Sequence, residues 1–236
     1  MARSWRPLFS PLECWSSVPA TDVQTVLRHT FKRWGLPKRF RVDNGVPWGS
    51  SGDLPPDLAL WLLGIDVGVT HNPPRRPQDN GVVERSQGTG KKWAEPGTCA
   101  TAKELQERLR EMDLIQRAEY PSVQGRSRLE AYPELKHSGC PYSRAWEREH
   151  WSLDRVLGGL AEYVVPRKVD KSGTVSLYNS NHYVGKLHVG KLIYVLLDPQ
   201  RCEWIFADDK GLQLRAQPAE QLARQRIETL TVTKRR

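Results

Sequence analysis

The amino-acid sequence predicts a protein of the α/β class, in which helices and short strands precede a small all-β barrel. Apolar residues recur at helical spacing over 23–34. Two short segments with alternating apolar residues follow, at 39–42 and 65–69, with a short apolar segment between them. From residue 162 onward, short apolar segments are separated by Gly, Asn and Asp, which is typical of a small antiparallel barrel.

The first predicted helix has a start signal and a stop signal. Thr21 is expected to be its N-cap, with Gln24 completing a capping box. Gly35 is placed to end the helix, and a proline follows two residues later. The next segment, at 39–42, alternates arginine with Phe and Val and predicts a strand that ends at Asp43.

The elements after this strand are predicted in the same way. The apolar segment 57–63 predicts a short buried helix, and alternation over 65–69 predicts a second strand. A proline-rich loop then leads to a helix that starts near Val82. A further helix is expected from Thr101, with Glu104 in its capping box.

Changes in composition predict four segments. They are 1–119 with helices and short strands, 120–160 as a linker with a connecting helix over 146–160, 161–217 as a small β-barrel, and 218–236 as a C-terminal helix with a basic tail. Pro218 is expected to start that last helix, because proline is favoured in a first helical turn.

The chain carries 36 Lys and Arg against 27 Asp and Glu, a net charge of +9. Such an excess is typical of proteins with a polyanionic partner, although solubility alone also accounts for it. No segment is apolar over the roughly eighteen residues that a membrane-spanning helix needs, so such a helix is not predicted. The four cysteines are scattered and form no Cys-x-x-Cys pair. This argues against a structural zinc site and favours a reducing cytoplasm.

Asp43 is the first candidate catalytic residue. Asn44 and Gly45 follow it, and this pair favours a tight hairpin. However, a loop rich in Pro, Gly and Ser comes next, and then a helix rather than a returning strand. The alternative to a hairpin is therefore a carboxylate exposed at a strand end, where catalytic side chains gather in α/β sheets.

Glu84 is the second candidate, in the first turn of the helix predicted from Val82. An acidic residue there stabilises a helix by about 0.3–1 kcal/mol through the helix dipole, which is one explanation for it. The other explanation combines it with Asp43 as a ligand of divalent ions, since hard carboxylate oxygens suit Mg²⁺ and Mn²⁺. Such ions activate a water or a 3′-hydroxyl in reactions of phosphodiesters.

Two segments resemble the DDE transposases and integrases of bacterial insertion sequences, which are relatives of retroviral integrases. They are VDNGVPW at 42–48 and LGIDVGVTHNPPRRPQDNGVVER at 63–85. The second catalytic Asp of this family stands in an Asp-Asn-Gly turn, which falls on Asp43. The catalytic Glu stands in a Pro-x-x-Asn-Gly-x-x-Glu-Arg segment, which falls on Glu84 and Arg85. The resemblance covers 20–95 and extends more weakly to KVDKSGTVSLYNSNHYVG at 168–185.

The resemblance implies that 1–119 are a truncated catalytic core with a partial ribonuclease H-like fold, and that the barrel at 161–217 binds DNA. It also implies cutting of transposon ends and joining of the freed 3′-hydroxyl to target DNA, with Mg²⁺ or Mn²⁺ held by an Asp-Asp-Glu triad. Asp43 and Glu84 would then be catalytic and metal-binding. The first Asp of the triad belongs to a strand upstream of residue 1, so we expect a truncated and inactive form. The only Asp before Asp43 is Asp22, in a first helical turn, where it complements the dipole.

Basic residues are expected to contact DNA phosphates, which positions a protein without reading sequence. Near Glu84 they are Arg75, Arg76, Arg85, Lys91 and Lys92, and in the barrel they are Arg167, Lys168, Lys171, Lys186 and Lys191. A solvated charged face is the other explanation for Lys91 and Lys92. Tyr178, Tyr183 and Tyr194 stand between the barrel cations and are either core residues or DNA contacts.

The sequence thus predicts a transposase- or integrase-type protein for DNA transposition and integration, in an inactive form. The alternatives are a non-enzymatic DNA-binding remnant, acting as partner or competitor of a full-length transposase, and a reading frame of a decaying mobile element. The expected partners are DNA, at transposon ends and at the target, and a second copy or a full-length transposase. No membrane partner is expected, and the expected location is the bacterial cytoplasm, in association with the nucleoid.

Overall fold

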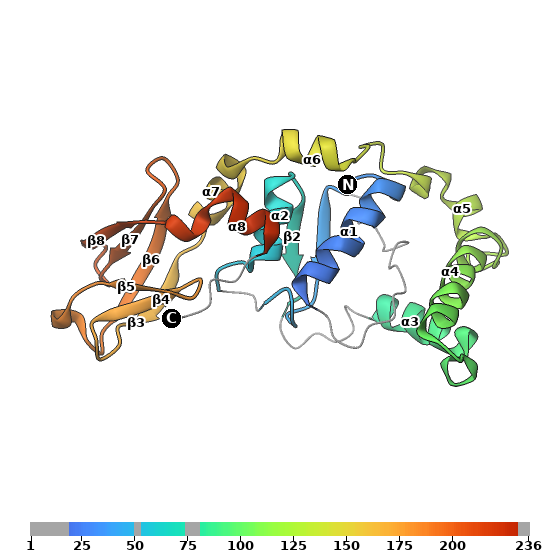
Figure 1. The fold of residues 1–236 in the computed structure, drawn as a ribbon, viewed down its shortest axis with the longest axis horizontal. Coiled ribbons are helices and arrows are strands. Elements are labelled where there is room, and N and C mark those ends of the chain that lie inside the picture. Colours follow the sequence, from blue (N-terminus) through green and yellow to red (C-terminus); the bar gives the residue numbers. More distant parts are fainter. Residues whose placement is uncertain (1–18, 50–52, 74–80, 231–236) are drawn as a thin grey trace. The chain divides into compact units, whose positions relative to one another are not determined.

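The computed structural model describes residues 19–49, 53–73 and 81–230, which form a mixed α/β chain (Figure 1). The chain divides into two compact units. The first unit comprises 1–37 and 72–146, and the second comprises 38–71 and 147–236. Among the described residues, no helix combines the length and the apolar character that crossing a membrane requires.

The first unit is helical. Its elements are α1 (Ala20–Trp34), α3 (Gly81–Ala94), α4 (Ala102–Ala118), α5 (Arg128–Ala131) and the short helices η2 (Pro96–Thr98) and η3 (Pro133–Lys136). Helices α3 and α4 pack against each other. The Trp93 ring at the end of α3 meets the Tyr120 ring beyond α4 edge-on, with centroids 5.3 Å apart. As predicted, α4 is capped by Thr101, whose Oγ1 accepts a hydrogen bond from the N–H of Glu104 at 3.1 Å.

Helix α1 starts at Ala20, two residues earlier than an N-cap at Thr21 predicts. Its N-cap is Pro19, and no side chain caps it, so the predicted capping box of Thr21 is wrong. Gln24 is buried instead, and its Oε1 accepts a hydrogen bond from Arg28 at 2.7 Å. The end of the helix is as predicted, because the N–H of Gly35 donates to the carbonyl of Phe31 at 2.8 Å.

The chain around residue 140 covers the buried side of α1. Phe31 is fully buried and meets the ring of Tyr142 edge-on, with centroids 5.6 Å apart. The N–H of Leu36 donates to the carbonyl of Cys140, and the N–H of Ser138 donates to that of Trp34, both at 2.8 Å. These residues lie in the segment 120–160, which the sequence predicted to be a linker.

The second unit begins with a parallel β-α-β arrangement of β1 (Arg39–Val42), α2 (Asp57–Gly64) and β2 (Gly68–His71). The strand at 39–42 and the helix that starts at residue 57 are both confirmed. Strand β2 begins later than the predicted 65–69, because Asp66 has a left-handed φ of 64° that interrupts extended backbone. Apart from Leu63, the apolar residues of α2 are almost completely buried.

Helix α2 is the centre of the second unit, and α7 (Leu153–Ala161) and α8 (Arg224–Thr229) pack against it. The indole N–H of Trp61 donates to Glu147 Oε1 at 3.0 Å, and that of Trp151 donates to the carbonyl of Trp61 at 3.2 Å. Trp151 and Ser152 interrupt the single helix predicted over 146–160. They separate α6 (Arg144–His150) from α7, whose N-cap is Ser152.

Six short strands form what we call the β-domain. They are β3 (Val165–Lys168), β4 (Thr174–Leu177), β5 (Ser180–Tyr183), β6 (Leu192–Asp198), β7 (Glu203–Ala207) and β8 (Gln213–Pro218). An antiparallel sheet has the order β3-β6-β7-β8, and β4 pairs with β5 as a separate hairpin, so the described strands do not form a closed barrel. Pro218 ends edge strand β8 and does not start a helix as predicted; η5 (Glu220–Leu222) and α8 follow it.

The β4–β5 hairpin packs on the sheet through aromatic side chains. His182 lies against Phe206, with ring centroids 5.7 Å apart. Its Nδ1 lies 3.1 Å from Gln217 Oε1, and its Nε2 lies 2.9 Å from Gln221 Nε2. Burial lowers the pKa of His182, although the hydrogen bond to Gln217 opposes that shift. Because this neutral ring fills both of its hydrogen-bonding positions inside the domain, it fixes the hairpin on the sheet.

Candidate functional site

Asp43 lies at the carboxyl end of β1, at an exposed position. Its Oδ1 accepts a hydrogen bond from the N–H of Gly45 at 3.1 Å, which is an Asx turn. The next strand, β2, runs parallel to β1 and does not return as a hairpin. The alternative of a carboxylate exposed at a strand end is therefore confirmed.

His71 is a residue at this edge that the sequence did not single out. It is the last residue of β2, and parallel strands bring their carboxyl ends to the same edge of a sheet. Its Nε2 lies at hydrogen-bonding distance, 3.1 Å, from the carbonyl of Trp48. This contact ties the loop that follows Asp43 to the end of β2. A histidine two residues after the strand predicted over 65–69 is the signal that would have pointed to it.

Glu84 lies in the first turn of α3 and is exposed, as is Arg85 beside it. Lys91 and Lys92 lie exposed in the last turn of the same helix. Seven residues separate Glu84 from Lys91, so both side chains leave one face of α3. Asp43 belongs to the second unit and Glu84 to the first. A metal site that uses both therefore stays a prediction.

Asp22 lies in the first turn of α1, as predicted. Arg75 and Arg76 fall outside the described residues. Within the described ranges, no group of three or more His, Cys, Asp or Glu is arranged to hold a metal ion.

Arg167 is held by an internal ion pair. Its guanidinium donates to Asp53 Oδ1 at 2.5 Å, and it comes from β3. Burial alone would raise the pKa of Asp53, but hydrogen bonds from Arg167 and from the N–H of Leu54, together with the Arg167 charge, lower it. Arg167 thus ties β3 to the segment before α2, and a phosphate would have to compete with Asp53 for it.

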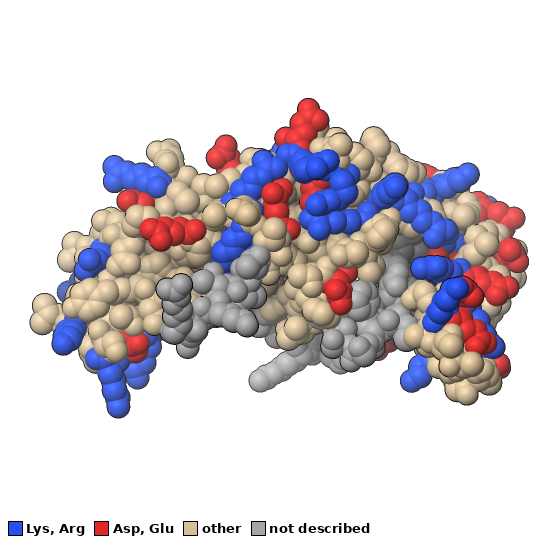
Figure 2. All heavy atoms as spheres, viewed as in Figure 1, with Lys and Arg blue, Asp and Glu red and all other residues tan. Residues whose placement is uncertain are grey.

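The other predicted cations of the β-domain are exposed, and they belong to neighbouring backbone segments. We call this cluster the basic tip; it comprises Lys168, Lys171, Lys186 and Lys191. Two loops that carry the cluster are joined by backbone hydrogen bonds: Val169 N–H donates to the carbonyl of Lys191, and Gly190 N–H to that of Val169, both at 3.0 Å. Figure 2 shows Lys and Arg side chains gathered at the lower left, over this end of the β-domain.

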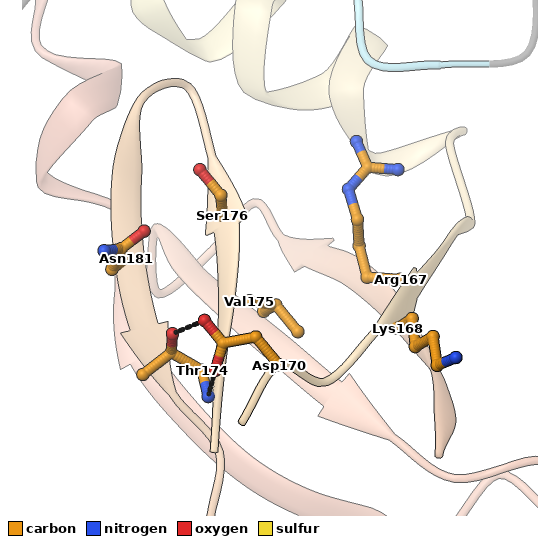
Figure 3. A pocket seen from close by; sticks show the side chains of 7 residues that line it. All are labelled: Arg167, Lys168, Asp170, Thr174, Val175, Ser176 and Asn181. Carbon is orange, nitrogen blue, oxygen red and sulfur yellow. Dashed lines mark hydrogen bonds between the residues drawn. The ribbon is translucent and has the colours of Figure 1, made fainter. Parts of the chain in front are cut away.

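An open hollow of about 500 Å³ adjoins the basic tip (Figure 3). Its lining residues are Arg167, Lys168, Asp170, Thr174, Val175, Ser176 and Asn181. The Asp170 carboxylate is turned into its own loop, where it accepts hydrogen bonds from the N–H groups of Ser172 and Thr174 and from Thr174 Oγ1. These hydrogen bonds, from Thr174 above all, lower the pKa of Asp170.

The three barrel tyrosines have different environments. The hydroxyl of Tyr178 donates to the carbonyl of Pro55 at 2.8 Å, and its ring lies 6.2 Å from that of Trp204, so Tyr178 is a packing residue. Tyr194 is half-buried in β6, whereas Tyr183 is exposed. The guanidinium of Arg215 lies 5.5 Å from the Tyr183 ring. Arg215 was missed because β8 was not predicted; the alternation of Leu212, Leu214 and Ala216 around it was the available signal.

The described residues could support two kinds of chemistry. The carboxylate of Asp43, at the end of a strand, could bind a divalent ion. The exposed lysines of the basic tip could contact phosphates. In a scan of known protein families, no family model matches this chain. The assignment of function therefore depends on the position and charge of these residues.

Proposed function

We propose that this chain is an inactive form of a transposase- or integrase-type protein, a type that acts on DNA by metal-dependent phosphoryl transfer. The observation that carries the proposal is the position of Asp43, at the carboxyl end of β1 in a parallel β-α-β arrangement. Catalytic side chains gather at this edge of α/β sheets. The finer fold that we propose is a partial ribonuclease H-like core followed by a small β-barrel.

The donor chemistry of the two candidate ligands fits a hard divalent ion. Asp43 and Glu84 are both exposed carboxylates, and carboxylate oxygens suit Mg²⁺ and Mn²⁺. A bound ion would activate a water or a 3′-hydroxyl and stabilise the leaving oxygen. Arg85, Lys91 and Lys92, on the helix that carries Glu84, would position the phosphates of the DNA.

The metal-binding part of the proposal can be tested without an activity assay. In the purified 236-residue chain, Fe²⁺ with ascorbate and peroxide should cut the backbone near Asp43 and near Glu84, and excess Mg²⁺ should suppress both cuts. Asp43→Asn and Glu84→Gln should each weaken both cuts, because in the proposed site both carboxylates would bind the same ion. Mass spectrometry of the fragments locates the cuts, and Glu107→Gln, an exposed carboxylate on α4, is the control.

Two results would contradict a shared metal site. One is the absence of cuts near both residues, and the other is a variant that removes only the cut beside its own position. Either result would leave a DNA-binding protein without this metal site.

The basic tip favours a second candidate function, which is DNA binding without catalysis. Its four lysines are exposed at the end of β3 and on the adjoining loops, which backbone hydrogen bonds hold together. The nearby acid, Asp170, is hydrogen-bonded within its own loop. Such a surface fits the phosphates of duplex DNA without reading their sequence. In this form the protein would act as a partner or competitor of a full-length transposase.

Salt dependence tests this DNA binding. The full chain should bind duplex DNA with little sequence preference, and the affinity should fall with salt because each neutralised phosphate releases counterions. Lys186→Ala combined with Lys191→Ala should reduce the log–log salt slope by about 1.8, at about 0.9 for each lost contact. Fluorescence anisotropy over a salt series measures this slope.

The matched control removes the same charge from the first unit. Lys103→Ala combined with Lys136→Ala changes two exposed lysines of that unit and should leave the slope close to that of the unmodified chain. An equal change in both double variants would mean that net charge, and not the basic tip, governs binding. Binding that does not respond to salt would contradict the proposal.

A further inference from the structure

Three apolar side chains are exposed within the basic tip. Leu187 is 87% exposed in the short helix η4 (Lys186–His188), Val189 is 41% exposed and Leu192 is 53% exposed. Single exposed leucines are ordinary on protein surfaces. Here, however, the most exposed of the three stands directly beside a lysine of the cluster, Lys186. This combination indicates a surface that would bind a partner with both negative charges and an apolar part.

The loop that carries Leu187 has a defined backbone. The N–H of His188 donates to the carbonyl of Gly185 at 3.1 Å, and that of Lys191 donates to the carbonyl of His188 at 3.0 Å. The N–H of Val184, at the entry to the loop, donates to the carbonyl of Gly173 at 2.8 Å. Because its backbone is already ordered, presenting the leucine to a partner costs little conformational entropy.

The charges around Leu187 favour an anionic partner. The four lysines of the basic tip would lose hydration against an apolar protein surface without gaining a counter-charge. Duplex DNA supplies phosphates for the lysines and stacked bases for the leucine. We propose that Leu187 enters the minor groove of duplex DNA and inserts between base pairs as an apolar wedge, with the basic tip on the flanking phosphates. This inference rests on the DNA binding proposed above and specifies its mode.

The physical balance of such a wedge is known from other DNA-binding surfaces. Inserting an apolar side chain partly unstacks a base step and kinks the duplex toward the major groove. The cost of unstacking is offset by the contacts that the bent duplex makes with the protein. The protein should therefore bend DNA, and the bend should depend on Leu187, whereas the salt dependence should depend on the lysines.

The experiment uses the full chain and a duplex that carries a fluorescent donor and acceptor at its ends. Binding should shorten the end-to-end distance, and a 2-aminopurine placed along the duplex should brighten where a base step unstacks. Leu187→Ala should abolish both signals and weaken binding about tenfold, with an unchanged salt slope. Leu187→Met, which keeps a long apolar side chain, should preserve both signals. A minor-groove ligand such as netropsin should compete with the protein.

The control is Val164→Ala, which shortens a side chain that is 54% exposed just before the start of β3. It should bend DNA like the unmodified chain. Because Leu187 is 87% exposed, its replacement should leave the thermal unfolding unchanged, which separates loss of the wedge from loss of the fold.

The outcomes separate this inference from the function on which it rests. Absence of DNA binding by the unmodified chain would overturn both. Binding that bends no DNA, or bending that survives in Leu187→Ala, would overturn the wedge alone. Two further results with bending intact in Leu187→Ala would give Leu187 another role. Dissociation of a dimer in sedimentation would make it a contact between two copies of the chain. Release from vesicles of anionic lipid would make it a membrane contact.

Discussion

Replacing Gly64 by alanine should lower the free energy of unfolding of the second unit by about 3 kcal/mol. A Cβ at this position would lie 2.1 Å from Trp151 Nε1 and 2.2 Å from its Cε2. The indole of Trp151 cannot rotate away without losing a hydrogen bond, because its N–H donates to the carbonyl of Trp61. Trp151 is also buried, so the surrounding side chains restrict its movement. The variant must therefore overpack the core or leave a buried donor unpaired, and each costs about 1–3 kcal/mol.

Urea unfolding followed by circular dichroism measures this effect, and Gly158→Ala is its control. Gly158 lies within α7, in the same unit, and a Cβ there would meet nothing within 4 Å. That variant should gain about 0.5–1 kcal/mol, because alanine is favoured over glycine inside a helix. Equal stability of the two variants would contradict the close approach of Trp151 to α2.

Replacing Gly35 by alanine should destabilise the first unit by about 2–4 kcal/mol. Gly35 has φ 78° and ψ 172°, a conformation that is almost restricted to glycine. A Cβ would also lie 2.6 Å from the carbonyl oxygen of Cys140. That oxygen accepts the N–H of Leu36, so the contact cannot relax without loss of this hydrogen bond.

Hydrogen exchange with mass spectrometry measures the effect locally. Exchange should quicken over α1 and over residues 137–142, which pair with the end of that helix. Gly88→Ala is the control in the same unit, because a Cβ at this helical position in α3 would meet nothing within 4 Å. If Gly35→Ala left α1 as well protected as Gly88→Ala does, the pairing of α1 with residues 138–140 would be wrong.

Local signals predicted the elements that depend on few residues. The cap of α4 required only Thr101 and Glu104, which are three positions apart. The strand that ends at Asp43 required only alternation over four residues, and the helix that starts at Asp57 required a short apolar segment. The position of Asp43 could be predicted for the same reason, since it depends on one strand end.

The errors arose where distant residues decide the conformation. Gln24 was expected to cap α1, but burial and Arg28 direct its side chain elsewhere. Pro218 was read as a helix start, whereas it ends β8, an edge strand, where the missing N–H of proline is tolerated. No local pattern shows that Tyr142 covers Phe31, because the two residues are far apart in the sequence. Leu187 was missed since exposure cannot be read from residue type.

The order in which the chain is synthesised has a consequence for α2. Its apolar side chains leave the ribosome with residues 57–64, whereas the helices that cover them, α7 and α8, begin at residues 153 and 224. A nascent chain that has reached residue 146 holds all of the first unit and only residues 38–71 of the second. Until residue 161 has been added, Leu58, Trp61 and Leu62 have neither helix beside them, and α8 follows only after residue 224. A chain released before then exposes an apolar segment to chaperones and proteases.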